Sequence, residues 1–406
     1  MSKLTNNSHQ RYSIIGAGAS GIFLALDLLK KGFAVDLYDH SGGALKKFLI
    51  AGKGGLNLTH SEELKSFVQK YGKNHSRFEL YLENFSNIEL IRWLSDYGIE
   101  TFVGSSKRIF PKELTAGEIL KIWLDKCKSY SQFKLYTKHS FVDFRTGIIL
   151  ENEKGIELNL GKEQIILALG GASYKHTGSD GKWKEVLDSM GIQTEEFVAI
   201  NCGYEVNWSS EFTQATAHKP LKNISITVNH QIVRGEVLFT EYGIEGSGIY
   251  AQSRLINEVI KDNQTCTIHI DLKPDLSIDQ IRKKFDKRQN KNSYTNFIRK
   301  CLNLDPLAIA LIKWNSTKNE FENIEVLIAL IKDCSIQLLR ARPLDQAISN
   351  AGGISFDEVN EDLSLKQYPG IYVIGEMLNW DAPTGGYLLQ GCLSMAAWVS
   401  KNIKTH

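Results

Sequence analysis

Residues 11–40 read RYSIIGAGASGIFLALDLLKKGFAVDLYDH, and this stretch decides the fold. Residues 12–15 are apolar and β-prone, so they predict a short buried strand. A glycine-rich turn follows without a gap, and residues 22–31 then carry the broad apolar face of a helix. Residues 34–38 predict a second strand, which ends at Asp39. Strand, turn, helix and strand in this order are typical of a dinucleotide-binding unit.

The turn Gly16-Ala-Gly-Ala-Ser-Gly21 has the spacing of a dinucleotide fingerprint. Gly16 permits the tight turn, Gly18 lets a diphosphate approach the backbone, and Gly21 lets the helix pack on the strand. The helix N-terminus offers N–H groups and the positive end of its dipole to phosphates. Asp39 stands where a carboxylate can accept hydrogen bonds from the adenosine ribose. The motif leaves open whether the cofactor is FAD or NAD.

Three further glycine turns follow along the chain. Residues 48–60, FLIAGKGGLNLTH, place three glycines within four positions and predict neither a good helix nor a good strand. Residues 164–171, QIILALGG, read as a buried strand running into a turn. Near the end, a strand at 371–374 precedes Gly375-Glu376, and DAPTGGYLLQG (381–391) leads into an apolar helix over 388–403. One dinucleotide-binding sheet built from both chain ends would gather all four turns.

The middle of the chain differs from its ends. Alternating residues at 223–229 and 266–271 predict antiparallel strands, and helical patterns follow at 278–285 and 324–332. We therefore expect an α/β, Rossmann-type FAD-binding domain from residues 1–194 and 346–406, interrupted by an inserted α+β substrate domain at 195–345.

The composition is that of an ordinary globular protein. The 406 residues have a net charge of +2, 42% hydrophobic and 23% charged residues, and no apolar run of membrane-spanning length. The six cysteines lie far apart and form no cluster with histidine, which predicts reduced thiols, a cytoplasmic location and no metal site.

Five motifs together resemble a known family. They are GAGASG (16–21), FLIAGKGGLNLTHSE (48–62), GGASYKHTGSDG (170–181), AISNAGGISFDEV (347–359) and GEMLNWDAPTGGYLLQG (375–391). The set resembles a bacterial family of FAD-dependent flavoproteins named after aminoacetone oxidase. Other members are described as NAD(P)/FAD-dependent oxidoreductases, as enone reductases acting on oxidised bile acids, or as flavoenzymes that reduce a uridine in ribosomal RNA.

The resemblance implies an FAD domain interrupted by an insert with a β-barrel-like part. It also implies that the 52–59 loop runs against the isoalloxazine ring, and that residues 385–387 offer N–H groups to that ring's pyrimidine edge. The residues expected at the cofactor are Gly16, Ala17, Gly18, Ala19, Ser20, Gly21, Asp39, His40, Lys47, Gly52, Gly54, Gly55, Asn57, Val142, Ala168, Gly170, Gly171, Gly375, Glu376, Gly385, Gly386, Tyr387 and Leu388.

The chain departs from many relatives at one place. Leu56 and Gly55 stand where those relatives have a cysteine and an arginine, so no thiol is expected beside the flavin. This difference indicates a sub-branch with no assigned substrate.

Four side chains are candidates for catalysis: Lys53, Arg108, Tyr174 and Tyr387. Lys53 is the one charge in the glycine loop, and a solvent-facing loop lysine is an equal alternative. Arg108 could hold a carboxylate or phosphate, with a surface salt bridge as the alternative. The two tyrosines could donate a proton or could simply pack, and hydride transfer does not require a single essential acid.

Residues 282–300 hold eight basic residues, one acidic residue and interleaved aromatics, as an RNA-contacting surface would. A solvated amphipathic helix pair is the favoured alternative. The sequence thus predicts an FAD-dependent oxidoreductase that oxidises an amine or reduces a conjugated double bond in a small organic substrate, with NAD(P)H as a transient electron donor. A reductase of a uridine in RNA and a non-enzymatic redox sensor are the alternatives.

Overall fold

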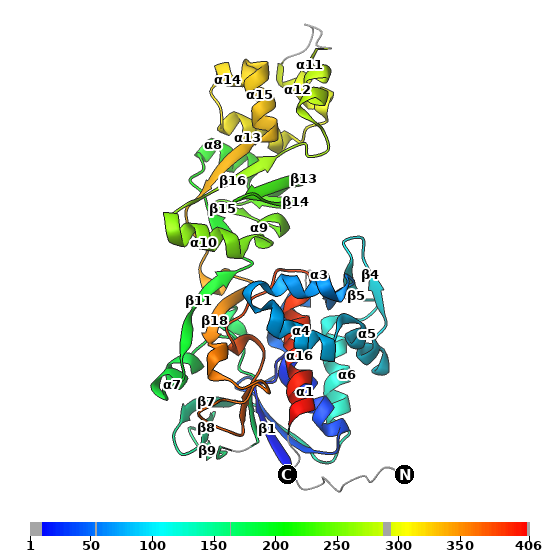
Figure 1. The fold of residues 1–406 in the computed structure, drawn as a ribbon, viewed down its shortest axis with the longest axis vertical. Helices are drawn as coiled ribbons and strands as arrows, with labels where there is room; N and C mark the ends of the chain where they lie inside the picture. The colour runs from blue at the N-terminus through cyan, green and yellow to red at the C-terminus, as the bar shows by residue number, and fades with distance from the viewer. Residues whose placement is uncertain (1–9, 53–54, 163, 287–293, 404–406) are drawn as a thin grey trace. The chain divides into compact units, whose positions relative to one another are not determined.

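The computed structural model describes residues 10–52, 55–162, 164–286 and 294–403 (Figure 1). The chain divides into two compact units, one formed by residues up to 198 together with those from 349 onward, the other by residues 199–348. Each unit has its own cluster of buried hydrophobic side chains.

The strands of the first unit are β1 (Arg11–Ile15), β2 (Ala34–Tyr38), β3 (Thr59–His60), β4 (Thr101–Val103), β5 (Arg108–Pro111), β6 (Phe133–Tyr136), β7 (His139–Phe144), β8 (Ile148–Asn152), β9 (Glu157–Asn159), β10 (Ile165–Leu167), β18 (Ser349–Ile354) and β19 (Ile371–Val373), with β11 (Thr194–Ile200) crossing into the second unit. Its α-helices are α1 (Ala19–Lys30), α2 (Lys46–Ala51), α3 (Leu64–Val68), α4 (His75–Asn84), α5 (Asn87–Asp96), α6 (Ala116–Lys128), α7 (Trp183–Ser189) and α16 (Tyr387–Asn402).

A parallel sheet with the strand order β19-β10-β1-β2-β6 lies at the centre of this unit. Three strands come from the first 136 residues and β19 comes from the last forty, so both chain ends build one sheet. The expected Rossmann-type α/β fold is confirmed. The carboxyl ends of β1, β10 and β19 lead directly into the glycine turns at 16, 170 and 375.

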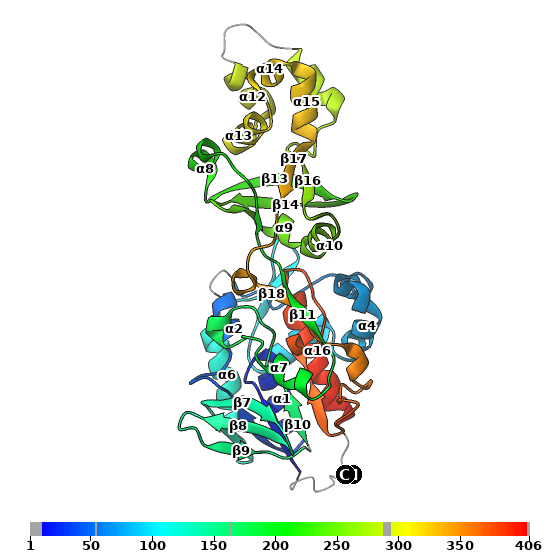
Figure 2. The same cartoon turned by 90° about the vertical axis from the view of Figure 1, so that its left-hand side faces the viewer.

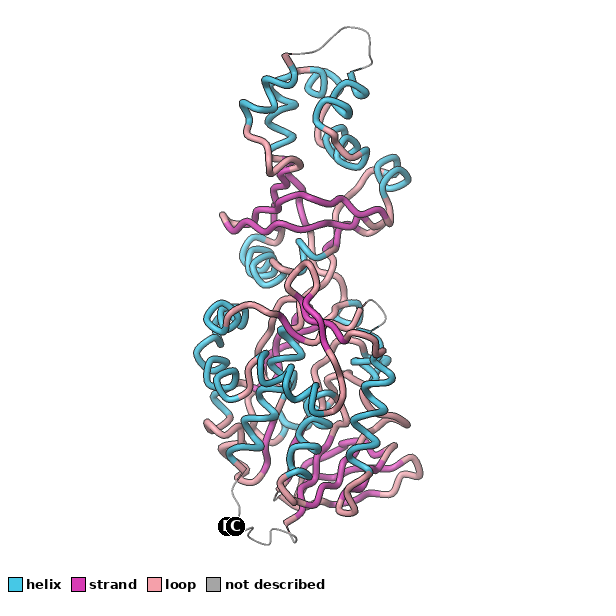
Figure 3. The backbone as a smooth tube through the Cα atoms, turned by 90° about the vertical axis from the view of Figure 1, so that its right-hand side faces the viewer, coloured by secondary structure: helices cyan, strands magenta, loops and turns pink. Residues whose placement is uncertain are grey.

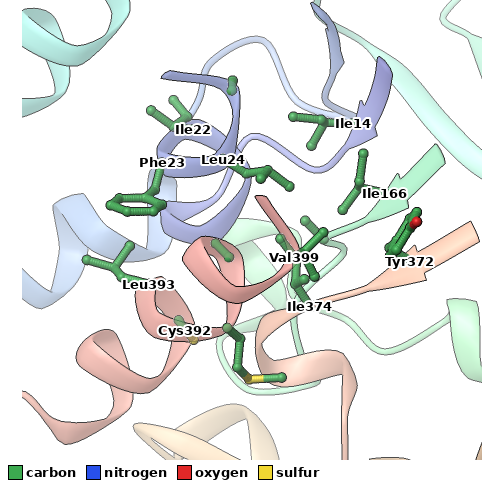
Figure 4. Close-up of a cluster of buried hydrophobic side chains, with 14 of the residues drawn as sticks. Ile14, Ile22, Phe23, Leu24, Ile166, Tyr372, Ile374, Cys392, Leu393 and Val399 are labelled. Atoms are coloured by element: carbon green, nitrogen blue, oxygen red, sulfur yellow. The ribbon is translucent and has the colours of Figure 1, made fainter. Parts of the chain in front are cut away.

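Helices α1 and α16 cover the sheet and pack against each other (Figure 4). Ile14 of β1 and Ile166 of β10 meet Leu24 of α1 and Val399 of α16, and each of these side chains is fully buried. Burial of these side chains holds both helices on the sheet, and both helices begin at glycine turns.

The segment 48–60 differs from expectation at both ends. Its first four residues complete helix α2, and its last two form strand β3. Burial explains the helix, because Phe48 packs its ring 5.5 Å from that of Trp123 on α6. Strand β3 is fixed by pairing with β5, which no local pattern encodes.

The second unit contains β12 (Tyr204–Glu205), β13 (Lys219–Val228), β14 (Gln231–Phe239), β15 (Gly243–Glu245), β16 (Cys266–Asp271), β17 (Cys334–Leu338), α8 (Ser210–Thr216), α9 (Ser247–Tyr250), α10 (Ser253–Asn263), α11 (Ile278–Phe285), α12 (Tyr294–Leu302), α13 (Pro306–Trp314), α14 (Lys318–Glu322) and α15 (Ile324–Lys332). Helices α9 and α10 lie on one side of its sheet, and α13 and α15 lie on the other (Figures 2 and 3).

The antiparallel sheet of this unit curls until its two edges meet. Its order is β12-β15-β14-β13-β16-β17. Glu205 of β12 donates its N–H to the Arg340 carbonyl at 2.9 Å and accepts one from Leu339 at the same distance, just beyond β17. The expected β-barrel-like part is therefore present in the insert.

The two basic helices of the insert, α11 and α12, are amphipathic. Phe285 is buried, and Phe297 packs against it with ring centroids 5.8 Å apart. Arg282 is paired with Glu325 on α15. Both phenylalanines of this segment therefore pack inward, and its described exposed residues are Lys283, Lys284, Asp286, Asn296, Arg299 and Lys300. Residues 287–293 lie outside the described ranges.

No helix in the described part of the chain is long and apolar enough to cross a membrane.

Candidate functional site

Of the three glycines in the first turn, only Gly18 has room for a side chain. A methyl group on Gly16, whose φ is +110°, would overlap the carbonyl of Ala168. A methyl group on Gly21 would overlap the carbonyl of Gly16. At Gly18, by contrast, no atom lies within 4 Å of that position. Gly16 and Gly21 therefore serve internal packing, whereas Gly18 borders open space.

Asp39 holds this turn in place. Its Oδ2 accepts the backbone N–H of Ala17 at 2.8 Å, and its Oδ1 accepts the N–H of Ser41 at 2.8 Å and its hydroxyl at 2.5 Å. His40 lies beside this carboxylate with Nδ1 at 3.6 Å from Oδ1, and its ring packs on Gly178. The end of β2 is thus tied to both the first and the third glycine turns.

A partly buried ion pair links α2 to the turn after β19. The Nζ atom of Lys47 lies 2.8 Å from both carboxylate oxygens of Glu376 and donates to the hydroxyl of Ser173 at 2.8 Å. The neighbouring Gly375 approaches Ser20 of α1 so closely that a methyl group would lie 2.8 Å from its hydroxyl oxygen. Residues from four distant segments therefore converge at the carboxyl ends of the parallel strands, where α/β folds bind ligands.

Burial is the main influence on the pKa of Cys392, whose sulfur would lie 3.8 Å from a methyl group built on Gly375. It raises the pKa of the thiol to about 12, with Glu376 adding to the rise. A thiol so hard to ionise is a poor nucleophile and a packing group at neutral pH.

The turn at 170–171 is fixed by Asn350 of β18. Its side-chain oxygen accepts the N–H of Ala172 at 2.9 Å and sits where a methyl group on Gly171 would lie. The hydroxyl oxygen of Ser179 is buried beside Gly170 and has no hydrogen-bond partner among the described residues.

A second group of residues forms where the 52–57 loop and the start of α16 approach sheet β3-β5-β4. Gly386, with φ +92°, lies so close to the backbone of Thr59 that a methyl group would be 2.5 Å away. A methyl group built on Gly385 would lie 3.9 Å from Arg108 Nε, and one built on Gly55 would lie 3.8 Å from the Phe110 ring. Both glycine segments therefore border the same strand, β5.

Tyr387, the first residue of α16, lies within an aromatic and charged cluster. Its ring stacks on that of His60 with centroids 5.3 Å apart and meets Phe67 edge-on at 4.7 Å. Burial raises the pKa of its hydroxyl, and the facing carboxylate of Glu62 raises it further. Tyr387 is therefore a neutral phenol that positions its neighbours.

His60 is a neutral imidazole at pH 7. Burial lowers its pKa, and this effect exceeds the opposing effect of Glu62. Its Nδ1 accepts the N–H of Glu62 at 3.2 Å. Arg108, directly opposite His60 in the sheet, forms no ion pair with any residue in the described part of the chain, so the surface salt bridge considered from the sequence is not found there.

The structure brings some predicted residues together and separates others. Arg108 and Tyr387 share the second group, while Tyr174 lies beside Ser173 in the first, its ring 5.6 Å from the exposed His176. Lys53 and Gly54 lie outside the described residues. Gly52 packs on Ala116, and the side-chain oxygen of Asn57 is buried without a partner among the described residues. Ala19 and Leu388 lie in the first turns of α1 and α16, and Val142 lies on β7.

Sequence reasoning missed His60, Glu62 and Asn350. His60 and Glu62 lie in the quoted 48–62 motif, but the pairing of His60 with Arg108 depends on the register between β3 and β5. Asn350 lies in the quoted 347–359 motif, so its position beside a glycine-rich stretch was the one available signal.

The sequence of the chain matches a known family. The sequence profile described as HI0933-like protein Rossmann domain matches residues 10–402. The chain belongs to this family. The resemblance inferred from the five motifs is confirmed.

Relatives within this family are similar over almost their whole length. A 3-dehydro-bile acid delta(4,6)-reductase of Clostridium scindens is 26% identical over 403 residues, covering 94% of this chain and 95% of that protein. A ribosomal RNA dihydrouridine synthase of Escherichia coli is 23% identical over 399 residues, with 95% of each chain covered. The chain is an FAD-dependent oxidoreductase.

A solved structure supports the fold. The 3-ketosteroid delta1-dehydrogenase from Sterolibacterium denitrificans, in complex with 1,4-androstadiene-3,17-dione, superposes with a TM-score of 0.51. The alignment covers 97% of this chain and 99% of that one at 11% identity, so the likeness concerns the fold alone.

The residues present fit FAD. Neither α1 nor α16 has a side-chain cap or an acidic residue in its first turn, so each N-terminus suits an electron-rich group. The space beside Gly18 suits a diphosphate. The unpartnered oxygens of Asn57 and Ser179 lie in segments where a polar cofactor would supply partners.

Proposed function

We propose that the turns at 16–21, 170–171 and 375–376 hold the adenosine, diphosphate and ribityl parts of FAD, and that the segments around 52–57 and 385–388 hold its isoalloxazine ring. Open space at Gly18 and the two uncapped helix N-termini support this assignment. Lys47 would exchange part of its contact with Glu376 for the cofactor, since it lies on α2, which ends at Gly52.

We further propose that the enzyme reduces a carbon–carbon double bond conjugated with a carbonyl in a small organic molecule. The Clostridium scindens relative is named a reductase of a 3-dehydro-bile acid, and the Escherichia coli relative is named for making dihydrouridine. Both names imply saturation of a double bond conjugated with a carbonyl. NAD(P)H would be the transient donor of electrons.

The choice of enone reduction over amine oxidation rests on one observation, the environment of Arg108. Addition of hydride to the double bond places negative charge on the carbonyl oxygen. A guanidinium that forms no ion pair within the described residues can stabilise that charge. Oxidation of an amine would bring a cationic substrate toward the same guanidinium, and the like charges would repel. The unpaired Arg108 therefore favours enone reduction over amine oxidation.

Bound FAD supplies the hydride in this reaction. The residues of the chain bind and orient the substrate. Arg108 would hold the carbonyl oxygen, while His60 and Tyr387 fix the strand and helix beside it through their stacked rings. Leu56 is buried at the edge of the loop, so the proton for the second carbon would come from water rather than from a thiol.

Anaerobic rapid mixing of the reduced protein with an enone such as 2-cyclohexenone tests the proposal. The flavin should regain its oxidised spectrum, and Arg108→Gln should slow this step by about 100-fold. Reduction by NADPH should change less than about twofold, because Arg108 acts on the carbonyl oxygen. Lys112→Gln is the matched control, since Lys112 is an exposed cation after the same strand and is paired with Glu100.

Two outcomes would contradict the proposal. Reduced flavin that no enone reoxidises would exclude the reaction class. An Arg108→Gln variant as fast as Lys112→Gln would remove the proposed role of the guanidinium.

Reduction of a uridine in RNA remains the second candidate, favoured by the names of two relatives at 23% identity. The inward packing of Phe285 and Phe297 argues against the basic helices as a stacking surface for bases. Reoxidation by an RNA fragment, but by no free enone, would support this candidate instead.

A further inference from the structure

One face of sheet β3-β5-β4 collects four side chains by register. His60 is paired directly with Arg108, and Phe110 is paired directly with Phe102. Directly paired residues share a face of a sheet, and so do residues two apart in one strand such as Arg108 and Phe110. The four side chains therefore form one row, which is polar at one end and aromatic at the other.

The aromatic end of this row is open. The rings of Phe102 and Phe110 stack with centroids 5.7 Å apart and planes 29° apart. Phe102 is 47% exposed, which is high for so large an apolar side chain in an ordered strand. A methyl group built on Gly55 would lie 3.8 Å from the Phe110 ring, so the aromatic pair lies beside Gly55.

The polar end of the row offers the guanidinium of Arg108. Arg108 forms no ion pair within the described residues, and its Nε lies 3.9 Å from the methyl position on Gly385. The Nδ1 of His60 accepts the N–H of Glu62, and the ring also forms a hydrogen bond with the backbone of Ser106, so the guanidinium is the donor that this end offers to a ligand. The row thus runs from one cationic donor to two stacked rings, beside both glycine segments.

We propose that this face is the substrate platform of the enzyme and that it selects a planar, fused-ring ketone. The carbonyl oxygen would be held by Arg108, and the apolar rings would lie on Phe110 and Phe102. The platform rests on the proposed function, because the same glycine segments are assigned there to the isoalloxazine ring.

The dimensions and chemistry of the row favour this class of ligand. Successive side chains on one face of a strand are roughly 7 Å apart, so the row from Arg108 through Phe110 matches a multi-ring skeleton and exceeds one small ring. An apolar, planar skeleton stacks on aromatic rings without needing further polar partners. A single base in RNA would also stack on these rings, so a uridine-containing RNA fragment is the competing ligand in the test.

Calorimetric titration of the purified holoprotein with 4-androstene-3,17-dione, 2-cyclohexenone and a uridine-containing RNA fragment tests the platform. Phe102→Ala should weaken binding of the fused-ring ketone by about tenfold. Val103→Ala is the matched control, because Val103 is the next residue of the same strand, faces the opposite way and is 58% exposed. It should change the dissociation constant by less than about twofold. Phe110→Leu should act as Phe102→Ala does and should keep the fold, since a large apolar side chain is retained.

The results separate the platform from the reaction. Weaker ketone binding in the two phenylalanine variants supports the platform even if reduced flavin is never reoxidised by the ketone, and that second result would contradict the proposed function alone. Three results overturn the platform: no binding of the fused-ring ketone, equal loss in Phe102→Ala and Val103→Ala, or a Phe102→Ala effect confined to the RNA fragment.

Discussion

Single residues of the first glycine turn divide into packing and binding roles. Gly18→Ala places a methyl group in open space, so the unfolding free energy of the apoprotein should fall by less than about 1 kcal/mol. Affinity for FAD should fall at least about tenfold, because the methyl group would occupy the approach that we propose for the diphosphate. Gly21→Ala should instead destabilise the apoprotein by more than about 2 kcal/mol through overlap with the Gly16 carbonyl. Denaturant unfolding of both apoproteins and FAD titration measure the difference, and equal destabilisation would contradict the division.

His60 predicts a pH dependence of stability. Its pKa is lowered in the folded protein, so the unfolded chain takes up a proton first as the pH falls. Stability should therefore rise with pH through the region below about 6.5, the ordinary histidine value. Between pH 7 and pH 5, the His60→Gln variant should lose less unfolding free energy than the wild type does. The control His75→Gln, which removes an exposed histidine, should lose as much as the wild type. Identical slopes in all three proteins would show that His60 does not titrate as its burial requires.

The sequence could predict residues whose role is local. Gly16, Gly18 and Gly21 follow from a fixed spacing, and the structure shows the space or crowding at each. Asp39 was expected at a ribose, and its observed hydrogen bonds to Ala17 and Ser41 could not be predicted from spacing. His60 depends on the register of a two-residue strand, and register is a long-range property.

At the scale of elements, strand β3 is held to helix α16 by Gln390. Its buried side-chain oxygen accepts the Thr59 hydroxyl at 2.8 Å, and its amide donates to the Phe85 carbonyl at 3.0 Å. Gln390→Leu should cost about 2 kcal/mol of stability by leaving these groups unpaired. Adding Thr59→Val should recover part of that loss, because both partners of one bond are then absent. Chemical denaturation measures the cycle, with the exposed Gln367→Leu as the control; a double variant no more stable than Gln390→Leu alone would contradict the pairing.

Helices with clear periodicity were predicted well. Residues 278–285 and 324–332 coincide with α11 and α15, because each has an apolar stripe and a capping residue at its start. The segment 48–60 was predicted poorly, since its helix is stabilised by the distant Trp123 and its strand by β5. Tertiary contacts overrode a weak local preference at both ends.

At the scale of the whole molecule, the gathering of both chain ends into one sheet was predicted because strands and glycine turns recur at each end. Closure of the insert's sheet through Glu205, Leu339 and Arg340 was expected only through the family resemblance, since no alternation in the sequence encodes where two sheet edges meet.

Two separate hydrophobic cores predict two unfolding transitions, only one of which responds to FAD. All the residues assigned to FAD lie in the first unit, so bound cofactor should stabilise that unit, by about 2.7 kcal/mol at 100 times its dissociation constant. The other transition can be assigned with Ile268→Ala, which empties a fully buried position of β16 and should lower only the midpoint of the second unit. Differential scanning calorimetry of apoprotein and holoprotein, each with and without Ile268→Ala, gives all four midpoints. A single transition that both FAD and Ile268→Ala displace would mean that the two cores unfold as one cooperative unit.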